Sequence, residues 1–323
     1  MKRKIMALLT TTILTVGIFT GCNANKEVEK PIENEVVETP VEGEETSEVQ
    51  TVYPLTIEDS TGNVVILEEK PDRIISVSPT ITEAMFSLDS KALLVGRTDY
   101  CDFPVEVTEI ESIGSLKEPN IEKIVELEPD IVIASAHFSE DVYEKLNELE
   151  VKVIVLNPND SFEGVYSTIK TLGQIVDANL IADELVNGMK TTVEEVEKKV
   201  SGLATPSVYY VVGFGEFGDF TAGGGTFISE MIKRANGNNI ADDVEGWSYS
   251  LEKVVEHDPE IVVISKYFDA KNGFVATNGY KDLTAVKEDN VFEIDNNLID
   301  RQGPRLAQGF EALARIIHPD AFK

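Results

Sequence analysis

IEKIVELEPDIVIAS (residues 121–135) and LEKVVEHDPEIVVIS (residues 251–265) are two copies of one pattern, and eight of their fifteen positions are identical. Each copy starts with apolar residues at helical spacing and continues, after a proline, as a short β-branched run typical of a buried strand. The copies lie too far apart for a solenoid, whose repeats recur about every 20–50 residues. We therefore interpret them as the same helix–strand unit in two related halves of the protein.

Strands and helices alternate on both sides of each copy. RIISVS (73–78) and LLVGRTDY (93–100) have the composition of strands, and Pro79 opens a helix between them. The alternation resumes at SVYYVVGF (207–214) and continues to the end of the sequence. Such alternation favours α/β lobes built on mainly parallel sheets.

The segment between the two halves, residues 161–204, predicts only helices, and the longer one covers NLIADELVNGMKTTVEEVEKKVSGL (179–203). The predicted fold class is therefore α/β, with two pseudo-symmetric α/β lobes, central mainly parallel sheets, one long joining α-helix and a ligand cleft between the lobes. The expected N-terminal lobe is 53–160 and the expected C-terminal lobe is 205–323.

The N-terminal segment has the pattern of a secretory signal peptide, which we place at residues 1–21. A basic start at residues 2–4 precedes an uncharged apolar stretch at 5–20 that is shorter than the roughly 20 residues of a membrane span. FTGC (19–22) resembles the bacterial lipobox, which implies that Cys22 is acylated. An ordinary signal peptide that ends near a cysteine is the alternative.

Residues 22–52 are expected to form a lipidated cysteine followed by a disordered acidic linker. Positions 23–52 contain nine glutamates and no aromatic residue, so they cannot bury enough apolar surface to fold. The net charge of −30 argues against a nucleic-acid partner. The expected location is outside the cell, on the outer face of the cytoplasmic membrane, with the lipid as the only membrane contact.

Cysteine and histidine usage limits the metal chemistry. Cys101 has no second cysteine beyond the expected anchor, so we expect no intramolecular disulfide and no cysteine metal site, and its role stays open. Three scattered histidines argue against a zinc or manganese site of the protein's own. We therefore predict no resident metal and no cofactor.

Several motifs together resemble the substrate-binding proteins of ABC importers for cobalamin, ferric siderophores and heme, a helical-backbone, two-lobe group. The resemblance covers residues 53–323. Its marks are RIISVSPTITEAMFSL (73–88), GRTDYCDFP (96–104), GGGTFISEMIKRANGNNIADD (223–243) and GPRLAQGFEALARIIHP (303–319), in addition to the repeat.

This resemblance implies a function. It implies a monomeric binding protein, not an enzyme, that captures a metal chelate and delivers it to a transmembrane permease dimer with its ATPase. TDYCDFP (98–104) and Trp247 resemble the cobalamin-binding branch most closely. The expected ligand is therefore a corrinoid like vitamin B12, with a ferric siderophore or heme as the alternative.

Glu122 and Glu252 occupy the same place in the two repeat copies, at the start of each expected helix. A carboxylate at this place complements the helix dipole, which is a sufficient structural reason for it. The alternative is that the two lobes present one acidic contact each to a two-fold symmetric permease, where arginine would pair with carboxylate. The family resemblance implies the docking role.

Ligand-contacting residues are expected in the loops that follow the strands, because open α/β sheets bind ligands outside the carboxyl ends of their strands. The aromatic residues would offer flat apolar area, and Arg301 could meet a carboxylate or amide of the ligand. Packing beneath loops, a surface pair of Arg301 with Asp295 or Asp300, and an ordinary loop role for His137 instead of metal coordination are the alternatives. The predicted ligand-binding residues are Ser78, Tyr100, Asp102, Phe103, His137, Trp247, Tyr249 and Arg301.

A function of another class is suggested by GFGEFG (213–218), which matches the glycine pattern of nucleotide-dependent enzymes. In a dinucleotide site the helix must begin within that motif, so that its N-terminus faces the diphosphate. Here DFTAGGGTF (219–227) intervenes and a helix is expected only near Thr226. We interpret the motif as a cleft loop. A purely structural surface lipoprotein is the remaining alternative.

Overall fold

A computed structural model describes residues 50–136, 138–216 and 218–323. The chain divides into two units, residues 1–46 and 47–323, and every described residue belongs to the second. The predicted signal peptide, Cys22 and His137 lie outside the described residues. No helix in the described ranges combines the length and hydropathy needed to cross a bilayer.

The first lobe is built on a four-stranded parallel sheet with the order β4-β3-β5-β6. A separate antiparallel hairpin, β1–β2, precedes it in the chain. The strands are β1 (Leu55–Glu58), β2 (Val64–Leu67), β3 (Ile74–Ser76), β4 (Leu94–Arg97), β5 (Ile131–Ala134) and β6 (Val153–Val155). The helices are α1 (Pro79–Ser87), α2 (Ile121–Glu126) and α3 (Glu140–Glu148).

The second lobe is built on a six-stranded mixed sheet. β7 pairs in parallel with β9 and β11, and β11 pairs in parallel with β12, whereas β8 is antiparallel to both of its neighbours, β7 and the edge strand β10. The strands are β7 (Ser207–Gly213), β8 (Asp219–Thr221), β9 (Asn238–Asn239), β10 (Ser248–Tyr249), β11 (Ile261–Ser265) and β12 (Val291–Ile294). The helices are α6 (Phe227–Arg234), α7 (Leu251–His257), α8 (Ala270–Ala276), α9 (Thr284–Lys287) and α10 (Asn297–Asp300).

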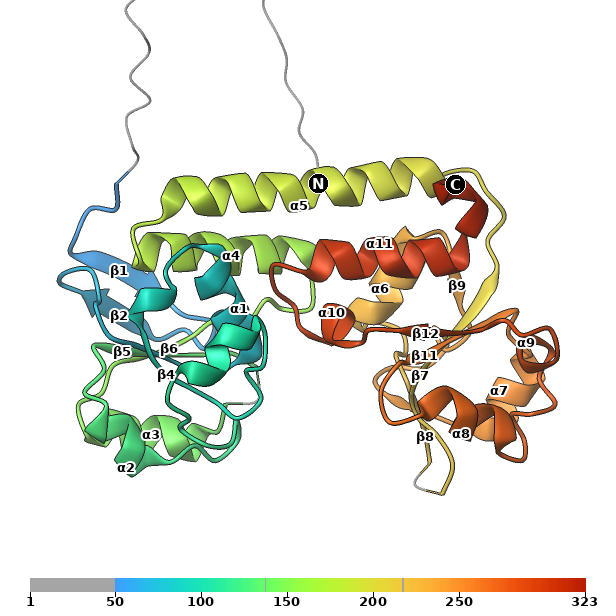
Figure 1. Cartoon of the computed structure of the whole chain (residues 1–323), viewed down its shortest axis with the longest axis horizontal. Helices are drawn as coiled ribbons and strands as arrows, with labels where there is room; N and C mark the ends of the chain where they lie inside the picture. Colours follow the sequence, from blue (N-terminus) through green and yellow to red (C-terminus); the bar gives the residue numbers. More distant parts are fainter. Residues whose placement is uncertain (1–49, 137, 217) are drawn as a thin grey trace, which may run out of the picture. The chain divides into compact units, whose positions relative to one another are not determined.

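Three helices pack together along both lobes and form what we call the helix layer. They are α4 (Phe162–Ile175), α5 (Asn179–Val200) and α11 (Leu306–Ile317). The long helix α5 packs against both α4 and α11, which lie end to end along it (Figure 1). The buried side chains of α5 recur every three or four residues and form one apolar stripe. They are Ala182, Val186, Met189, Val193, Val196 and Val200. The predicted class, two α/β lobes joined by one long helix, is confirmed.

The repeat is visible in the three-dimensional structure. Each copy forms a short helix, α2 or α7, followed by an interior strand of its sheet, β5 or β11. Glu128 and Asp258, which occupy equivalent positions before the proline, both have a left-handed backbone, with φ of 44° and 39°. The same local conformation therefore ends the helix in both copies.

Sequence reasoning was less accurate at two places. The antiparallel strands β8 and β10 were not expected, since they are only two or three residues long and carry no alternation that a pattern could detect. Leu180, which has helical spacing with the apolar residues of α5 in the sequence, is 45% exposed in the first turn of the helix and does not join the buried stripe.

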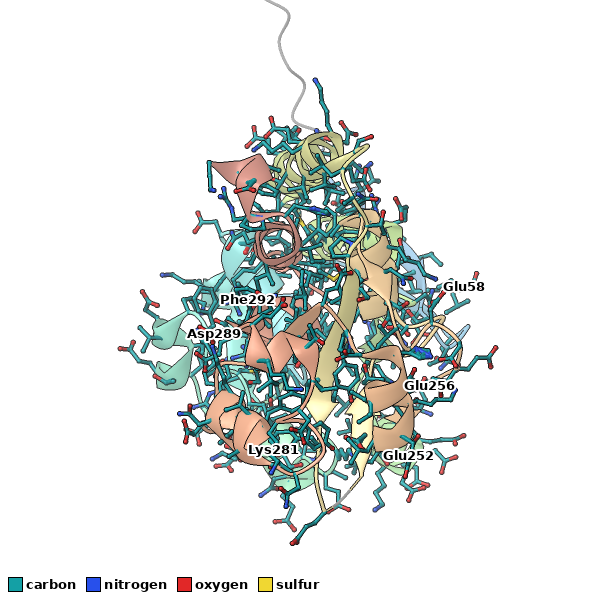
Figure 2. All side chains as sticks on the ribbon, turned by 90° about the vertical axis from the view of Figure 1, so that its right-hand side faces the viewer. Glu58, Glu252, Glu256, Lys281, Asp289 and Phe292 are labelled. Atoms are coloured by element: carbon teal, nitrogen blue, oxygen red, sulfur yellow. The ribbon has the colours of Figure 1, made fainter. Side chains whose placement is uncertain are left out.

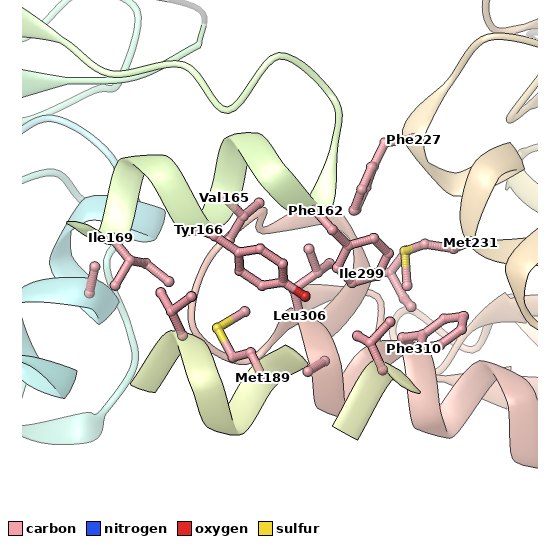
Figure 3. Packing of buried hydrophobic residues seen from close by; sticks show 14 of the residues in the cluster. Phe162, Val165, Tyr166, Ile169, Met189, Phe227, Met231, Ile299, Leu306 and Phe310 are labelled. Atoms are coloured by element: carbon pink, nitrogen blue, oxygen red, sulfur yellow. The ribbon is translucent and has the colours of Figure 1, made fainter. Parts of the chain in front are cut away.

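Aromatic packing joins the helix layer to the second lobe. Phe162 at the start of α4 is fully buried, with its ring centroid 5.2 Å from that of Phe227 and 5.6 Å from that of Phe310 (Figure 3). Phe227 belongs to α6 of the second lobe and Phe310 to α11. One apolar cluster thus continues from the first lobe through the helices into the second.

Phe162→Ala should lower the free energy of unfolding by about 3–5 kcal/mol, since it leaves a cavity in this cluster. Phe268→Ala is the matched control, because Phe268 is fully exposed and its loss should cost less than about 0.5 kcal/mol. Urea denaturation followed by circular dichroism measures both values. An equal decrease in the free energy of unfolding for both variants would show that the packing of Phe162 does not stabilise the apolar cluster.

Candidate functional site

A cavity of about 710 Å³ lies between the two lobes. It is formed at the carboxyl ends of strands from both sheets, and its size falls within the roughly 300–1,000 Å³ of small-molecule sites. The first lobe contributes Ser78, Pro79, Thr80, Leu116, Ser135, Ala136, Asn157, Pro158 and Asp160. The second contributes Val212, Phe227, Ile228, Trp247, Ile299, Asp300, Arg301 and Gln302.

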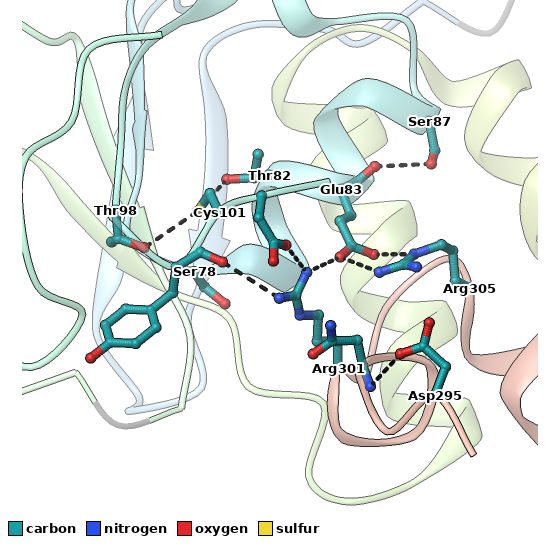
Figure 4. Close-up of polar contacts among 12 residues, drawn as sticks. Ser78, Thr82, Glu83, Ser87, Thr98, Cys101, Asp295, Arg301 and Arg305 are labelled. Atoms are coloured by element: carbon teal, nitrogen blue, oxygen red, sulfur yellow. Dashed lines mark hydrogen bonds and ion pairs between the residues drawn. The ribbon is translucent and has the colours of Figure 1, made fainter. Parts of the chain in front are cut away.

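A buried ion cluster borders this cavity and connects α1 to the segment before α11. Glu83 of α1, only 3% exposed, accepts hydrogen bonds from Arg301 (Nη1 to Oε1, 2.8 Å) and from Arg305 (Nε to Oε2, 2.8 Å; Nη2 to Oε1, 2.6 Å). Figure 4 shows the Glu83 carboxylate between the two guanidinium groups. The same Nη1 of Arg301 also donates to Asp102 Oδ1 at 2.7 Å. The positive charges of Arg301 and Arg305 and the negative charges of Glu83 and Asp102 therefore sum to zero in this cluster.

The protonation of the cluster follows from these contacts. Burial alone would lower the pKa of Arg301, but hydrogen bonds and charges from Asp102 and Glu83 raise it above its usual value. The guanidinium therefore stays charged. Arg305 also stacks on the ring of Phe103, with its guanidinium carbon 3.8 Å from the ring centroid.

Two further carboxylates face the cavity, and neutral groups support them. Gln302 Nε2 donates to Asp160 Oδ1 at 2.6 Å, and Asn296 Nδ2 donates to Asp300 Oδ2 at 2.8 Å. Although Asp300 is open to the cavity, loss of hydration raises the pKa of its carboxyl group. Hydrogen bonds from Asn296 and Tyr210 and the charge of Arg301 act in the opposite direction.

Most of the sequence-predicted residues come together around the cavity. Ser78, Trp247 and Arg301 line it, and Trp247 is 49% exposed. Asp102 and Phe103 lie at the adjacent ion cluster. Tyr100, which is 60% exposed, has its carbonyl oxygen 3.5 Å from Arg301 Nη2.

Tyr249 lies elsewhere, in the core of the second lobe. It is 8% exposed, its ring lies beside that of Tyr209, and its hydroxyl donates to the carbonyl oxygen of Ile240 at 2.8 Å. Burial raises the pKa of this hydroxyl. Packing and one hydrogen bond account for Tyr249, and it does not line the cavity.

The partners of Arg301 within the protein differ from the surface pair that the sequence raised as an alternative. Among the described residues, Arg301 donates to Glu83, 218 positions away in the chain, and to Asp102, and not to Asp295 or Asp300. Glu83 and Arg305 were missed. A glutamate inside the apolar run of TITEAMF (80–86) was the available signal, because a charged residue on a buried helix face needs a partner.

The glycine motif at 213–218 does not begin a helix. β7 ends at Gly213, and β8 begins at Asp219 and returns antiparallel to it. The next helix is α6, whose N-cap Thr226 accepts a hydrogen bond from the backbone of Ser229. Among the described residues of this motif, the geometry that would direct a helix N-terminus at a diphosphate is therefore missing.

Two α/β lobes, a helix layer that joins them and a cavity between their strand ends together define an extracytoplasmic-type solute-binding protein. A profile of the family described as "Periplasmic binding protein" matches residues 74–298. The chain belongs to this family.

Individual relatives agree with that assignment. An uncharacterized ABC transporter substrate-binding lipoprotein, YvrC, of Bacillus subtilis is 32% identical over 279 residues, covering 84% of this chain and 88% of the relative. A cobalamin-binding protein of Halobacterium salinarum is 26% identical over 279 residues, covering 82% and 74%. A crystal structure of a possible iron-binding, periplasmic solute-binding protein from Staphylococcus epidermidis superposes with a TM-score of 0.69 at 27% identity, covering 77% of this chain and 100% of that one.

Glu83→Gln should lower the free energy of unfolding by about 3 kcal/mol, because it leaves two largely buried guanidinium groups with one exposed partner, Asp102. Glu311→Gln is the control, since Glu311 pairs with Arg315 on the surface of α11 and should cost less than about 0.5 kcal/mol. Urea denaturation measures the free energy of unfolding of both variants. A similarly small decrease in both would mean that water screens the charges of the Glu83 cluster.

Proposed function

We propose that this protein binds a metal chelate, in the first place a corrinoid, and delivers it to the permease and ATPase of an ABC importer. The observation that carries the proposal is the cavity of about 710 Å³ between the lobes, with the half-exposed indole of Trp247 on its wall. The cobalamin-binding name of a relative that covers 82% of the chain supports a corrinoid. Binding and release without chemical conversion of the ligand is sufficient for this role.

The proposed contacts combine flat apolar area with hydrogen bonds. Trp247 would stack on the ligand, and Tyr100 and Phe103 would extend the aromatic surface at the rim beside Arg305. Ser78 would offer a polar contact from the first lobe, and Asp102 would act through Arg301. His137 remains a proposed contact on its position alone, next to the cavity-lining Ala136.

We also propose the route to the membrane. Residues 1–21 would direct export, and Cys22 would carry the lipid. Residues 22–52 would tether the folded part to the outer face of the cytoplasmic membrane as a monomer. This folded part consists of the lobes at 53–160 and 205–323 with the helices at 161–204 between them. The basic, apolar and Gly-Cys sequence of the N-terminal segment supports the assignment, as does the lipoprotein name of the relative from Bacillus subtilis.

Calorimetric titration with cyanocobalamin, cobinamide, heme and ferric siderophores tests the ligand. We expect sub-micromolar binding of a corrinoid, with an affinity that Trp247→Ala weakens about tenfold, or about 1.4 kcal/mol, through loss of stacking. Phe322→Ala is the control, because Phe322 lies on the C-terminal turn against Lys199 and Arg315. Binding of heme or a siderophore alone would keep the importer role and make that chelate, instead of a corrinoid, the ligand. The Staphylococcus structure, described as a possible iron-binding protein, favours this alternative.

Docking on the permease is proposed to use Glu122 and Glu252. Both are exposed in the first turns of α2 and α7, and Figure 2 shows Glu252 at the surface. The N-cap contacts are supplied by other residues: Asn120 Oδ1 accepts from Lys123 N at 3.0 Å and Ser250 Oγ accepts from Lys253 N at 3.3 Å. The two glutamates are therefore not needed as side-chain caps.

The double variant Glu122→Lys/Glu252→Lys should abolish cellular uptake and leave solution binding unchanged, since it reverses charge away from the cavity. The matched control is Glu126→Lys/Glu256→Lys, at equivalent exposed positions one turn further along the same helices. Uptake of labelled ligand and calorimetry measure the two properties. Loss of solution binding, or equal loss of uptake in the control, would contradict the docking assignment.

A further inference from the structure

The charge of the cavity wall indicates which chelates can enter. Among the described residues that line the cavity, Asp160, Asp300 and Arg301 have ionisable side chains. The first two come from opposite lobes, after β6 and after β12. The balance between these three groups decides the sign of charge that a ligand meets.

Arg301 contributes almost no free positive charge to the cavity. Its Nη1 is shared between Glu83, at 2.8 Å, and Asp102, at 2.7 Å. Arg305 is the second cation of the cluster, so two positive and two negative groups cancel locally. A ligand carboxylate that approached Arg301 would meet a guanidinium whose charge Glu83 and Asp102 already balance.

Asp160 and Asp300 line the cavity without an ion-pair partner among the described residues. In the described part of the chain neither forms a salt bridge, and their hydrogen-bond donors are the uncharged side chains of Gln302, Asn296 and Tyr210. Arg301 attracts Asp300 at longer range, but its charge is already balanced by the cluster. Both carboxylates have lone pairs free for further N–H donors.

We infer that the cavity selects chelates without net negative charge that present amide or amine N–H groups to Asp160 and Asp300. An anionic ligand would bury its charge next to two carboxylates and lose hydration without gaining a partner. A corrinoid carries peripheral amides and fits this wall. Heme, with two propionates, and ferric tris-catecholates, which are strongly anionic, do not. The inference rests on the proposed role in chelate capture and narrows it.

A pair of ligands that differ in one functional group tests the inferred charge selectivity. Cyanocobalamin and its monocarboxylate derivative, in which one peripheral amide is hydrolysed to an acid, are titrated into the full-length protein in detergent, with cobinamide, heme and a cationic ferric hydroxamate alongside. The neutral and cationic chelates should bind at least about tenfold more tightly than the matched acid and heme, as expected for like charges in a partly buried site.

The protein variants provide the second half of the test. Asp160→Asn/Asp300→Asn should reduce the preference for amide over acid about tenfold, because asparagine keeps an acceptor oxygen and removes the charge. Glu184→Gln/Glu195→Gln on the exposed side of α5 removes the same net charge far from the cavity and should leave the preference unchanged. If the double variant folds poorly, Asp160→Asn alone replaces it, because Asp160 is exposed, and this variant should show part of the reduction in preference.

The outcomes separate the inference from the proposed function. Tight binding of heme or of the monocarboxylate, or an unchanged preference in the double variant, would overturn the charge selectivity and leave chelate capture intact. Failure of every chelate, whatever its charge, to bind the wild-type protein would overturn both.

Discussion

Burial of one apolar stripe of α5 against both α4 and α11 is the constraint on which the remaining structure depends. The helix is 22 residues long, and both α4 and α11 pack against it. Phe162, Phe227 and Phe310 continue the same packing across the joint. The spacing of the lobes, and hence the cavity between their strand ends, follows from this helix layer.

The Glu83 cluster adds a polar contact to that apolar joint. Its members come from α1, from the loop after β4 and from the segment that leads into α11, so it ties the first lobe to the final helix of the chain. Burying the three charges of Glu83, Arg301 and Arg305 is favourable only when each is paired. In the charge selectivity that we propose, this pairing balances the charge of Arg301 and leaves the carboxylates of Asp160 and Asp300 to set the charge of the wall.

Several properties were determined by local sequence. The repeat at 121–135 and 251–265 predicted the helix–strand unit of each lobe, because helical spacing, a proline and a β-branched run suffice to specify it. The apolar period predicted α5, and the composition after Gly213 excluded a helix at the glycine motif. The same local logic placed Ser78, Trp247 and Arg301 at strand ends, where the cavity lies.

Only tertiary structure decided which side chains meet. Glu83 and Arg305 are 222 positions apart, and nothing in either local sequence indicates the other. Tyr249 and Trp247 are two residues apart, yet the first is buried against Tyr209 and the second faces the cavity, because Trp247 lies in the bend before β10 and not in the strand itself. Sequence by itself determined the elements, the lobes and the family resemblance. Partners and cavity charge depend on distances between segments that are remote along the chain, which only folding establishes.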